Sequence, residues 1–192
     1  MHRLGKYTAS DRMSDLVCGN YHILLIMSRF GIALGFGDRT VDEVCCQSGV
    51  DTATFLAVVN LLYDEGTTTV DCRNVSLEAF LRYLHNSHDY FLQYRLPDIR
   101  RKLSEAVACG CDGIAEAIIR FFDDYAAEAK LTELKNILIK YYPASESCGK
   151  EMNGVLFDIF LCESELASHN DLENRLFIPA VAEVERKIRD AR

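Results

Sequence analysis

Proline and alternating, strand-like sequence are scarce in this chain of 192 residues. Only three prolines occur, and the one short alternating stretch, residues 67–71, is better explained as a connector than as a strand. Apolar residues instead recur every three or four positions, which is the period of an α-helix. No apolar run approaches the roughly 20 residues that span a bilayer. The sequence therefore predicts an all-α protein with no membrane association.

Positive charge is also in short supply. The chain has 21 Lys and Arg against 29 Asp and Glu, a net charge of −8 and a pI near 5.1. Nucleic acids and anionic membranes are bound by clustered Lys and Arg, so we expect neither as a partner. Residues 40–62 have the rhythm of a helix-turn-helix, but no Lys or Arg occurs from Thr40 to Gly66. That absence argues against DNA contact by this segment.

The chain has eight cysteines, but they lack the C-x-x-C spacing of a zinc knuckle or a thioredoxin-like site. With 49% hydrophobic residues, the chain has enough apolar material for a packed core without disulfides. The N-terminus contains no apolar signal-peptide segment. We therefore expect reduced thiols and a cytoplasmic protein.

The helical pattern divides the chain into a small N-terminal helical domain, residues 11–66, and a helical bundle, residues 76–190. In the first part, the segment Gly31–Gly37 is rich in glycine, but no strand precedes it and no P-loop lysine follows. It is predicted to be a turn. Thr40 and Glu43 have the spacing of a capping box, which predicts that a helix starts there.

A polar pair interrupts an apolar stripe near the C-terminus. His169 and Glu173 are four residues apart, so a helix places them on one face. Apolar residues continue that face: Cys162, Leu166, Leu176, Ala180, Val184 and Ile188. An unpaired carboxylate buried there would cost several kcal/mol, on the order of the penalty for any isolated buried charge. Either a metal ion or a buried ion pair is expected to neutralise it.

A second stripe at the start of the bundle carries another histidine. It consists of Leu77, Leu81, Leu84, His88 and Phe91. His88 lies in this predicted core stripe, whereas His85 lies at its flank. A lone core histidine is most simply a hydrogen-bonded structural residue. Opposite His169 and Glu173, however, His88 favours a metal site, because facing bundle helices supply imidazole and carboxylate ligands to non-haem iron. The predicted metal ligands are His88, His169 and Glu173.

The residues around these ligands resemble a known family. The run Leu84-His-Asn-Ser-His88-Asp-Tyr-Phe-Leu-Gln-Tyr-Arg95-Leu-Pro97 resembles the first helix of a hemerythrin-like (HHE cation-binding) domain. The run His169-Asn-Asp-Leu-Glu173-Asn-Arg-Leu-Phe177-Ile-Pro179 resembles its last helix. The N-terminal part is similar to the small first domain of the repair-of-iron-centres family, at Phe30-Gly-Ile32 and Thr40-Val-Asp-Glu43-Val-Cys45. The resemblance implies a small helical domain followed by an up-down hemerythrin-like bundle.

The chain departs from this family in the middle of the bundle. The resemblance implies a His-x-x-x-Glu on the second helix and a further histidine on the third, but no histidine occurs between Gly113 and Pro143. The apolar stripe changes phase at Ala129-Lys130, from the positions of Ile118 and Phe122 to those of Leu131, Leu134 and Leu138. A ligand-bearing hairpin of the family is thus absent from the sequence. The three ligands that remain resemble a mononuclear set with open positions.

Two functions follow as alternatives. The resemblance implies a protein that holds non-haem iron, takes O2 or NO as a small ligand, and helps to repair iron-sulfur clusters in client proteins under stress. The alternative is a metal-free regulatory or protein-interaction module with a degenerate site. The two apolar stripes also suggest a swapped homodimer. No Ser or Cys has an identifiable histidine partner, so hydrolase chemistry is unsupported.

Overall fold

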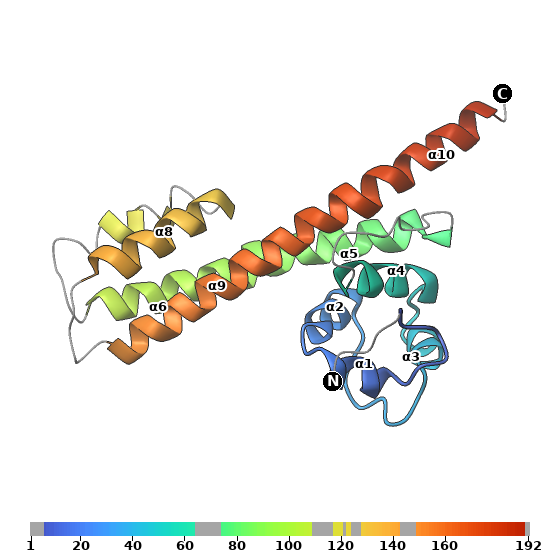
Figure 1. The fold of residues 1–192 in the computed structure, drawn as a ribbon, viewed down its shortest axis with the longest axis horizontal. Helices are drawn as coiled ribbons and strands as arrows, with labels where there is room; N and C mark the ends of the chain where they lie inside the picture. Colours follow the sequence, from blue (N-terminus) through green and yellow to red (C-terminus); the bar gives the residue numbers. More distant parts are fainter. Residues whose placement is uncertain are drawn as a thin grey trace. The chain divides into compact units, whose positions relative to one another are not determined.

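The computed structural model describes residues 6–63, 74–108, 117–120, 122–123, 128–142 and 149–190 (Figure 1). Within these ranges the regular structure is helical, and the only β pairing is an isolated bridge between Arg12 and Thr40. The predicted all-α class is therefore confirmed. None of the described helices is both long and apolar enough to cross a bilayer. The predicted connector at residues 67–71 lies outside the described ranges.

The described residues form two compact units, and the chain passes from the first to the second and back. Unit 1 consists of residues 1–88 and 169–192, and unit 2 of residues 89–168. The predicted domains, residues 11–66 and 76–190, are each continuous in the sequence, and this division stays a prediction. The spatial grouping differs from it because α5 and the residues after 168 pack with the N-terminal helices.

Unit 1 is built from short N-terminal helices packed on two later segments. Its elements are α1 (Met13–Gly19), α2 (Ile23–Phe30), α3 (Val41–Gln47), α4 (Thr52–Tyr63), α5 (Leu77–Asp89), the last residues of α9 (Gly149–Leu172), η3 (Glu173–Phe177) and α10 (Ile178–Asp190). Figure 1 shows α1 to α4, in blue to teal, grouped on one side of α5. Their core includes Phe55, Phe80 and Tyr83, and also Leu172 and Leu176 from the C-terminal segment.

Local sequence signals set the ends of these helices as predicted. Thr40 Oγ1 accepts a hydrogen bond from the Glu43 backbone N–H at 3.3 Å, and the Thr40 N–H donates to Glu43 Oε2 at 2.8 Å. These two bonds are the capping box that starts α3. Gly31 ends α2 with φ of +74°, a left-handed conformation that glycine adopts without a Cβ clash.

Unit 2 is also helical and has its own core. It contains η2 (Tyr90–Arg95), α6 (Leu96–Ala108), α8 (Glu128–Tyr141) and residues 149–168 of α9. Leu131, Leu134 and Leu138 of α8 are buried against Ile99 and Ile159, as the second apolar stripe predicts. Ala129 and Lys130 lie within α8, whereas residues 124–127 before it are outside the described ranges.

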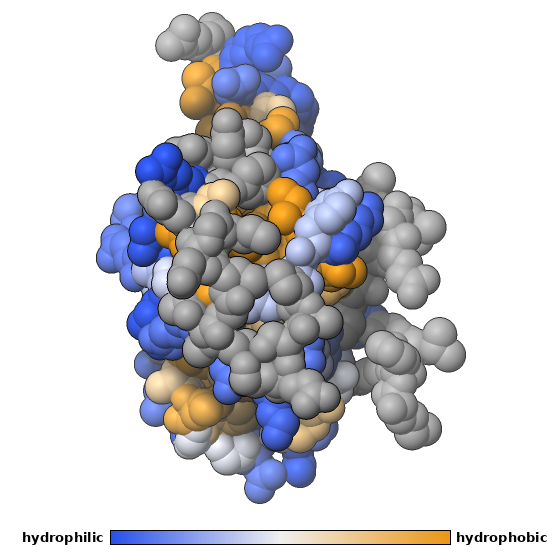
Figure 2. All heavy atoms as spheres, turned by 90° about the vertical axis from the view of Figure 1, so that its left-hand side faces the viewer, coloured by the Kyte–Doolittle hydropathy of each residue, from blue (hydrophilic) through white to orange (hydrophobic). Residues whose placement is uncertain are grey.

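Some predicted stripe members are exposed, and those predictions are wrong. Leu81 on α5, and Val184 and Ile188 on α10, are all exposed. On α5 the buried positions are Phe80, Tyr83, Leu84 and Ser87. The N-terminal helices of unit 1 pack on the face that carries Phe80 and Tyr83, whereas Leu81 is 47% exposed. Figure 2 shows the left-hand side of Figure 1, where orange apolar side chains lie at the surface between blue hydrophilic ones.

Both π-helical turns precede a proline by the same interval. η2 ends at Arg95 with Pro97 two residues later, and η3 ends at Phe177 with Pro179 two residues later. A proline inside a helix donates no hydrogen bond, and its ring clashes with the carbonyl four residues before it. A wider turn relieves that clash, so the Leu-Pro and Ile-Pro sequences account for the two turns.

A charged pair ties two segments of unit 2 together. Arg95 Nη1 lies 3.3 Å from Asp158 Oδ1, and both side chains are largely buried. Lys102 Nζ lies 2.7 Å from the other carboxylate oxygen of Asp158. Asp158 therefore neutralises two cations, one of them shielded from solvent.

We predict that Asp158→Asn lowers the free energy of unfolding by about 2–3 kcal/mol, because it leaves a shielded arginine without its counter-charge. The matched control is Asp123→Asn, which breaks the exposed pair between Arg100 and Asp123 and should have a smaller effect. Urea denaturation of the two variants checks this. Equal losses in both would contradict the importance of the buried pair.

Candidate metal centre

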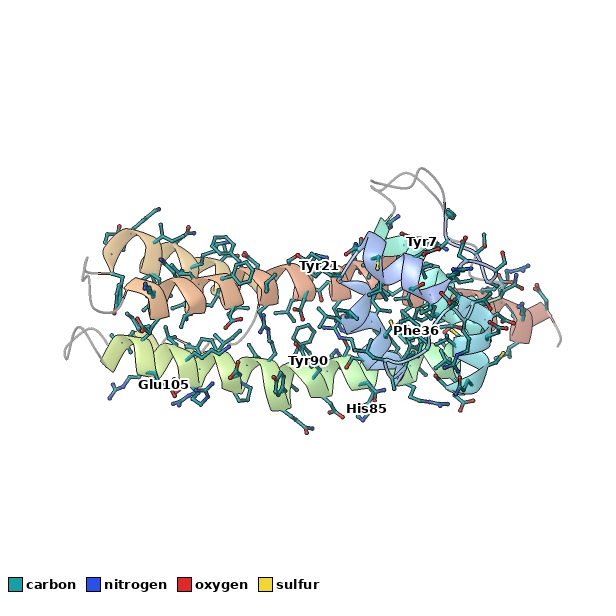
Figure 3. All side chains as sticks on the ribbon, turned by 90° about the horizontal axis from the view of Figure 1, so that it is seen from below. Tyr7, Tyr21, Phe36, His85, Tyr90 and Glu105 are labelled. Atoms are coloured by element: carbon teal, nitrogen blue, oxygen red, sulfur yellow. The ribbon has the colours of Figure 1, made fainter. Side chains whose placement is uncertain are left out.

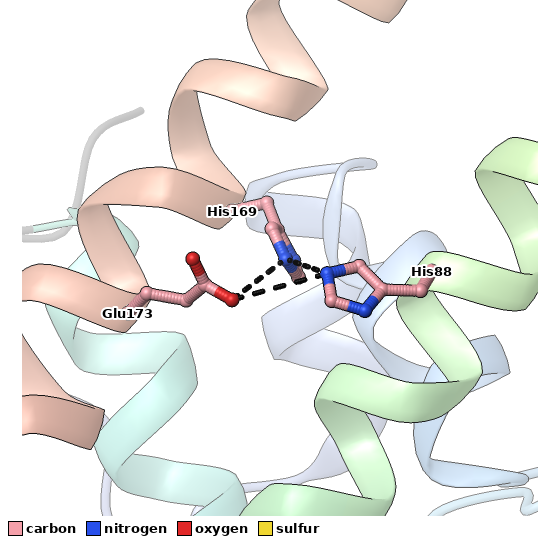
Figure 4. Close-up of side chains that lie close together, drawn as sticks. All are labelled: His88, His169 and Glu173. Carbon is pink, nitrogen blue, oxygen red and sulfur yellow. Dashed lines mark hydrogen bonds and ion pairs between the residues drawn. The ribbon is translucent and has the colours of Figure 1, made fainter.

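The three residues predicted as metal ligands lie together in unit 1 (Figure 4). Nε2 of His88 lies 3.0 Å from Nε2 of His169. Oε1 of Glu173 lies 3.4 Å from the His169 nitrogen and 3.8 Å from the His88 nitrogen. These are the only three described His, Cys, Asp or Glu residues that converge in this way.

Each ligand has a clear position in its helix. His88 is the second-last residue of α5, and His169 is in the last turn of α9. Glu173 is the first residue of η3, one turn after His169. The π-helical turn that Pro179 induces therefore begins at a predicted ligand. Such turns are rare and are often found at functional sites.

The ligands differ strongly in exposure. The His169 side chain is 4% exposed, that of Glu173 36% and that of His88 56%. His169 thus forms the inner part of the cluster, and His88 and Glu173 form its outer part. The prediction that all three point into a core is correct for His169 only. The α5 face that carries Leu81 and His88 is not covered by the N-terminal helices.

The spacing of the three atoms fits a bound metal ion. An ion about 2.1 Å from each ligand atom places adjacent ligand atoms about 3.0 Å apart in an octahedron and about 3.4 Å apart in a tetrahedron. Two of the observed separations, 3.0 and 3.4 Å, match these values, and the third, 3.8 Å, is somewhat longer. Small side-chain rotations are enough to bring all three atoms onto one ion. Two imidazoles and a carboxylate on one face are the ligand set of non-haem iron(II) sites.

Burial keeps His169 in the neutral form that a metal requires. The pKa of His169 is lowered from its ordinary value of 6.5, mainly because burial removes water from the charged form. The carboxylate of Glu173 opposes this shift, whereas the charges of His88 and Arg29 add to it. The contact between the two Nε2 atoms also requires one nitrogen to donate and the other to accept. An ion pair centred on a charged His169 is therefore disfavoured.

Arg29 is a feature of the site that sequence reasoning missed. It is buried on α2, and its charge lies close enough to His169 to lower the pKa of that imidazole. The amide of Asn86 donates a hydrogen bond of 2.8 Å to the Arg29 carbonyl oxygen, which joins α2 to α5. The sequence signal was an arginine near the end of the largely apolar run Ile23–Phe30.

The described cysteines do not take part in the site. Cys18 and Cys46 are exposed thiols, and Cys45 and Cys162 are buried thiols. Burial raises the pKa of Cys45 to about 12, so this thiol stays protonated at neutral pH. No disulfide joins these four, the expectation of reduced thiols stays a prediction, and the remaining cysteines lie outside the described ranges.

Comparisons of the chain with protein-family models, with curated proteins and with solved structures found no match. The similarity to hemerythrin-like domains therefore rests on the residues quoted above and stays a prediction. The arrangement of His88, His169 and Glu173 is an observation independent of that similarity.

We predict that the metal-free protein loses stability as the pH falls below about 6.5, the ordinary pKa of histidine. The unfolded chain protonates His169 at that pH, whereas the folded chain resists protonation because its pKa is lowered. Protons thus bind the unfolded state more tightly. In His169→Gln this contribution is absent, so its stability should fall less on acidification. Urea denaturation in chelator at about pH 7.5 and about pH 5.5 measures the difference. An equal fall in the free energy of unfolding of both proteins would contradict the lowered pKa of His169.

Proposed function

We propose that this chain is a non-haem iron protein in which His88, His169 and Glu173 hold one iron(II) ion. The observation that supports it best is the convergence of two imidazole nitrogens and one carboxylate oxygen within 3.8 Å. Such a facial set leaves coordination positions open. When bound, the iron would supply a site for small ligands such as water, O2 or NO.

The protein residues around the ligands have separate roles in this proposal. The His169 side chain is only 4% exposed, and its Nε2 lies 3.0 Å from Nε2 of His88, so its ring is confined before a metal arrives. Glu173 supplies the negative charge that offsets part of the charge of a divalent ion. Arg29 places a fixed positive charge beside the site, which favours an anionic ligand at an open position.

The cellular role that we propose follows from the family resemblance alone. A hemerythrin-like protein of the repair-of-iron-centres type would use its iron in the response to nitric oxide or oxygen stress. Iron-sulfur proteins would then be its clients. The second candidate, a metal-free interaction module, is favoured by one sequence observation. The chain has no histidine between Gly113 and Pro143, where the family pattern calls for further ligands.

Metal analysis of the full chain separates the two candidates. We predict about one iron per chain after anaerobic loading with Fe(II) and removal of excess metal, from the count of one three-ligand set. His169→Ala and Glu173→Ala should each lose most of it, whereas the matched control His22→Ala should retain it because His22 is not part of the cluster.

A thermal melt with and without Fe(II) provides the second readout. A metal that binds only the folded state raises the melting temperature of the wild type, and this rise should vanish in His169→Ala. A wild-type protein that retains no iron and melts at the same temperature with Fe(II) would exclude the iron proposal and leave the interaction module.

A further inference from the structure

The metal centre of one chain is open on its outer side. His169 lies on the inner side, and His88 and Glu173 are 56% and 36% exposed. Three protein atoms therefore approach an ion from one face only, and the other positions face outward. An additional protein ligand at this site must come from outside the described cluster, because no fourth His, Cys, Asp or Glu among the described residues joins it.

A second histidine lies beside His88 on α5 without reaching this cluster. His85 is three residues before His88, so the two side chains are neighbours on one side of the helix, with Cβ atoms about 5–6 Å apart. Both are exposed, and Figure 3 shows His85 on the outward side of α5. Leu81, one further turn back, is exposed on the same side. We call Leu81, His85 and His88 the α5 stripe.

The α5 stripe has the properties of a self-complementary surface. It carries an apolar residue and two imidazoles, and no group of fixed charge. On α10 of the same unit, the apolar side chains of Ile178, Val184 and Ile188 are also exposed. The charges of α10 are balanced, with Glu183, Glu185 and Asp190 against Arg186, Lys187 and Arg189. Neither the α5 stripe nor α10 therefore carries an excess charge of one sign that would hold two copies of the chain apart.

From this arrangement we infer that Fe(II) joins two copies of the chain through the α5 stripe, with His85 of each copy binding the ion held by the other. In a twofold contact, if residue i meets residue j of the partner, then j also meets i. An axis that passes between His85 and His88 of antiparallel α5 helices places the two histidines opposite each other. Each ion would then have three imidazoles and one carboxylate.

This inference rests on the proposed iron function, but the two have different tests. The inference predicts that the wild type has the mass of one chain in chelator and of two chains with Fe(II), with one iron per chain. Light scattering after gel filtration gives the mass, and metal analysis of the same fractions gives the iron content. Added chelator should reverse the change.

Two variants test the surface and the ligand separately. His85→Ala keeps three of the four proposed ligands, so it should still contain iron but keep the mass of one chain. Leu81→Glu places a charge at the apolar position of the stripe, where burial against a second copy would cost free energy, so it should also remain a single chain with iron bound. His22→Ala is the matched histidine control and should form dimers with Fe(II) as the wild type does.

The outcomes are distinguishable. Iron-loaded wild type with the mass of one chain would overturn the inference and leave the iron function intact. A dimer that persists in chelator, or a His85→Ala protein that dimerises with Fe(II) like the wild type, would overturn the bridging role of His85. A wild type that binds no iron would overturn the proposed function, and the inference with it.

Discussion

The candidate site depends on the close approach of two imidazoles, His88 Nε2 and His169 Nε2, at 3.0 Å. Two charged imidazoles would repel each other at this distance, and burial lowers the pKa of His169 further. The folded chain therefore holds at least one neutral imidazole beside a carboxylate. Neutral imidazole and carboxylate are the forms that bind divalent metals, so the same constraint that disfavours protonation prepares the site for a cation.

Proline has a part in shaping this site. Pro179 follows Glu173 by six residues, and the wide turn between them starts at the glutamate itself. The same order of residues occurs around the other helix, where η2 begins two residues after His88 and Pro97 follows. A π-helical turn changes the direction of the side chains that follow it relative to a regular α-helix. The Leu-Pro and Ile-Pro sequences thus influence how the ligands are presented, although neither proline is part of the cluster.

His88, His169 and Glu173 stand in apolar stripes of the sequence, and this placement was enough to predict their proximity. The apolar period also predicted the helical class. It did not show which side of each helix is covered. Leu81 and Val184 fit an apolar period but are exposed, because the covering helices come from distant parts of the chain. Arg29 was missed for the same reason, since its approach to His169 depends on how α2 packs. Periodicity defines a face, and only tertiary packing decides what lies on it.

The most direct test of the site is X-ray absorption spectroscopy at the iron edge of the Fe(II)-loaded protein. Binding by His88, His169 and Glu173 predicts the scattering of at least two imidazoles together with oxygen ligands, all about 2.0–2.2 Å from the metal. Replacement of His169 by Ala should remove most of the bound iron, and with it the imidazole scattering. A first shell of oxygen alone, or sulfur ligands at about 2.3 Å, would contradict a centre built from these three residues.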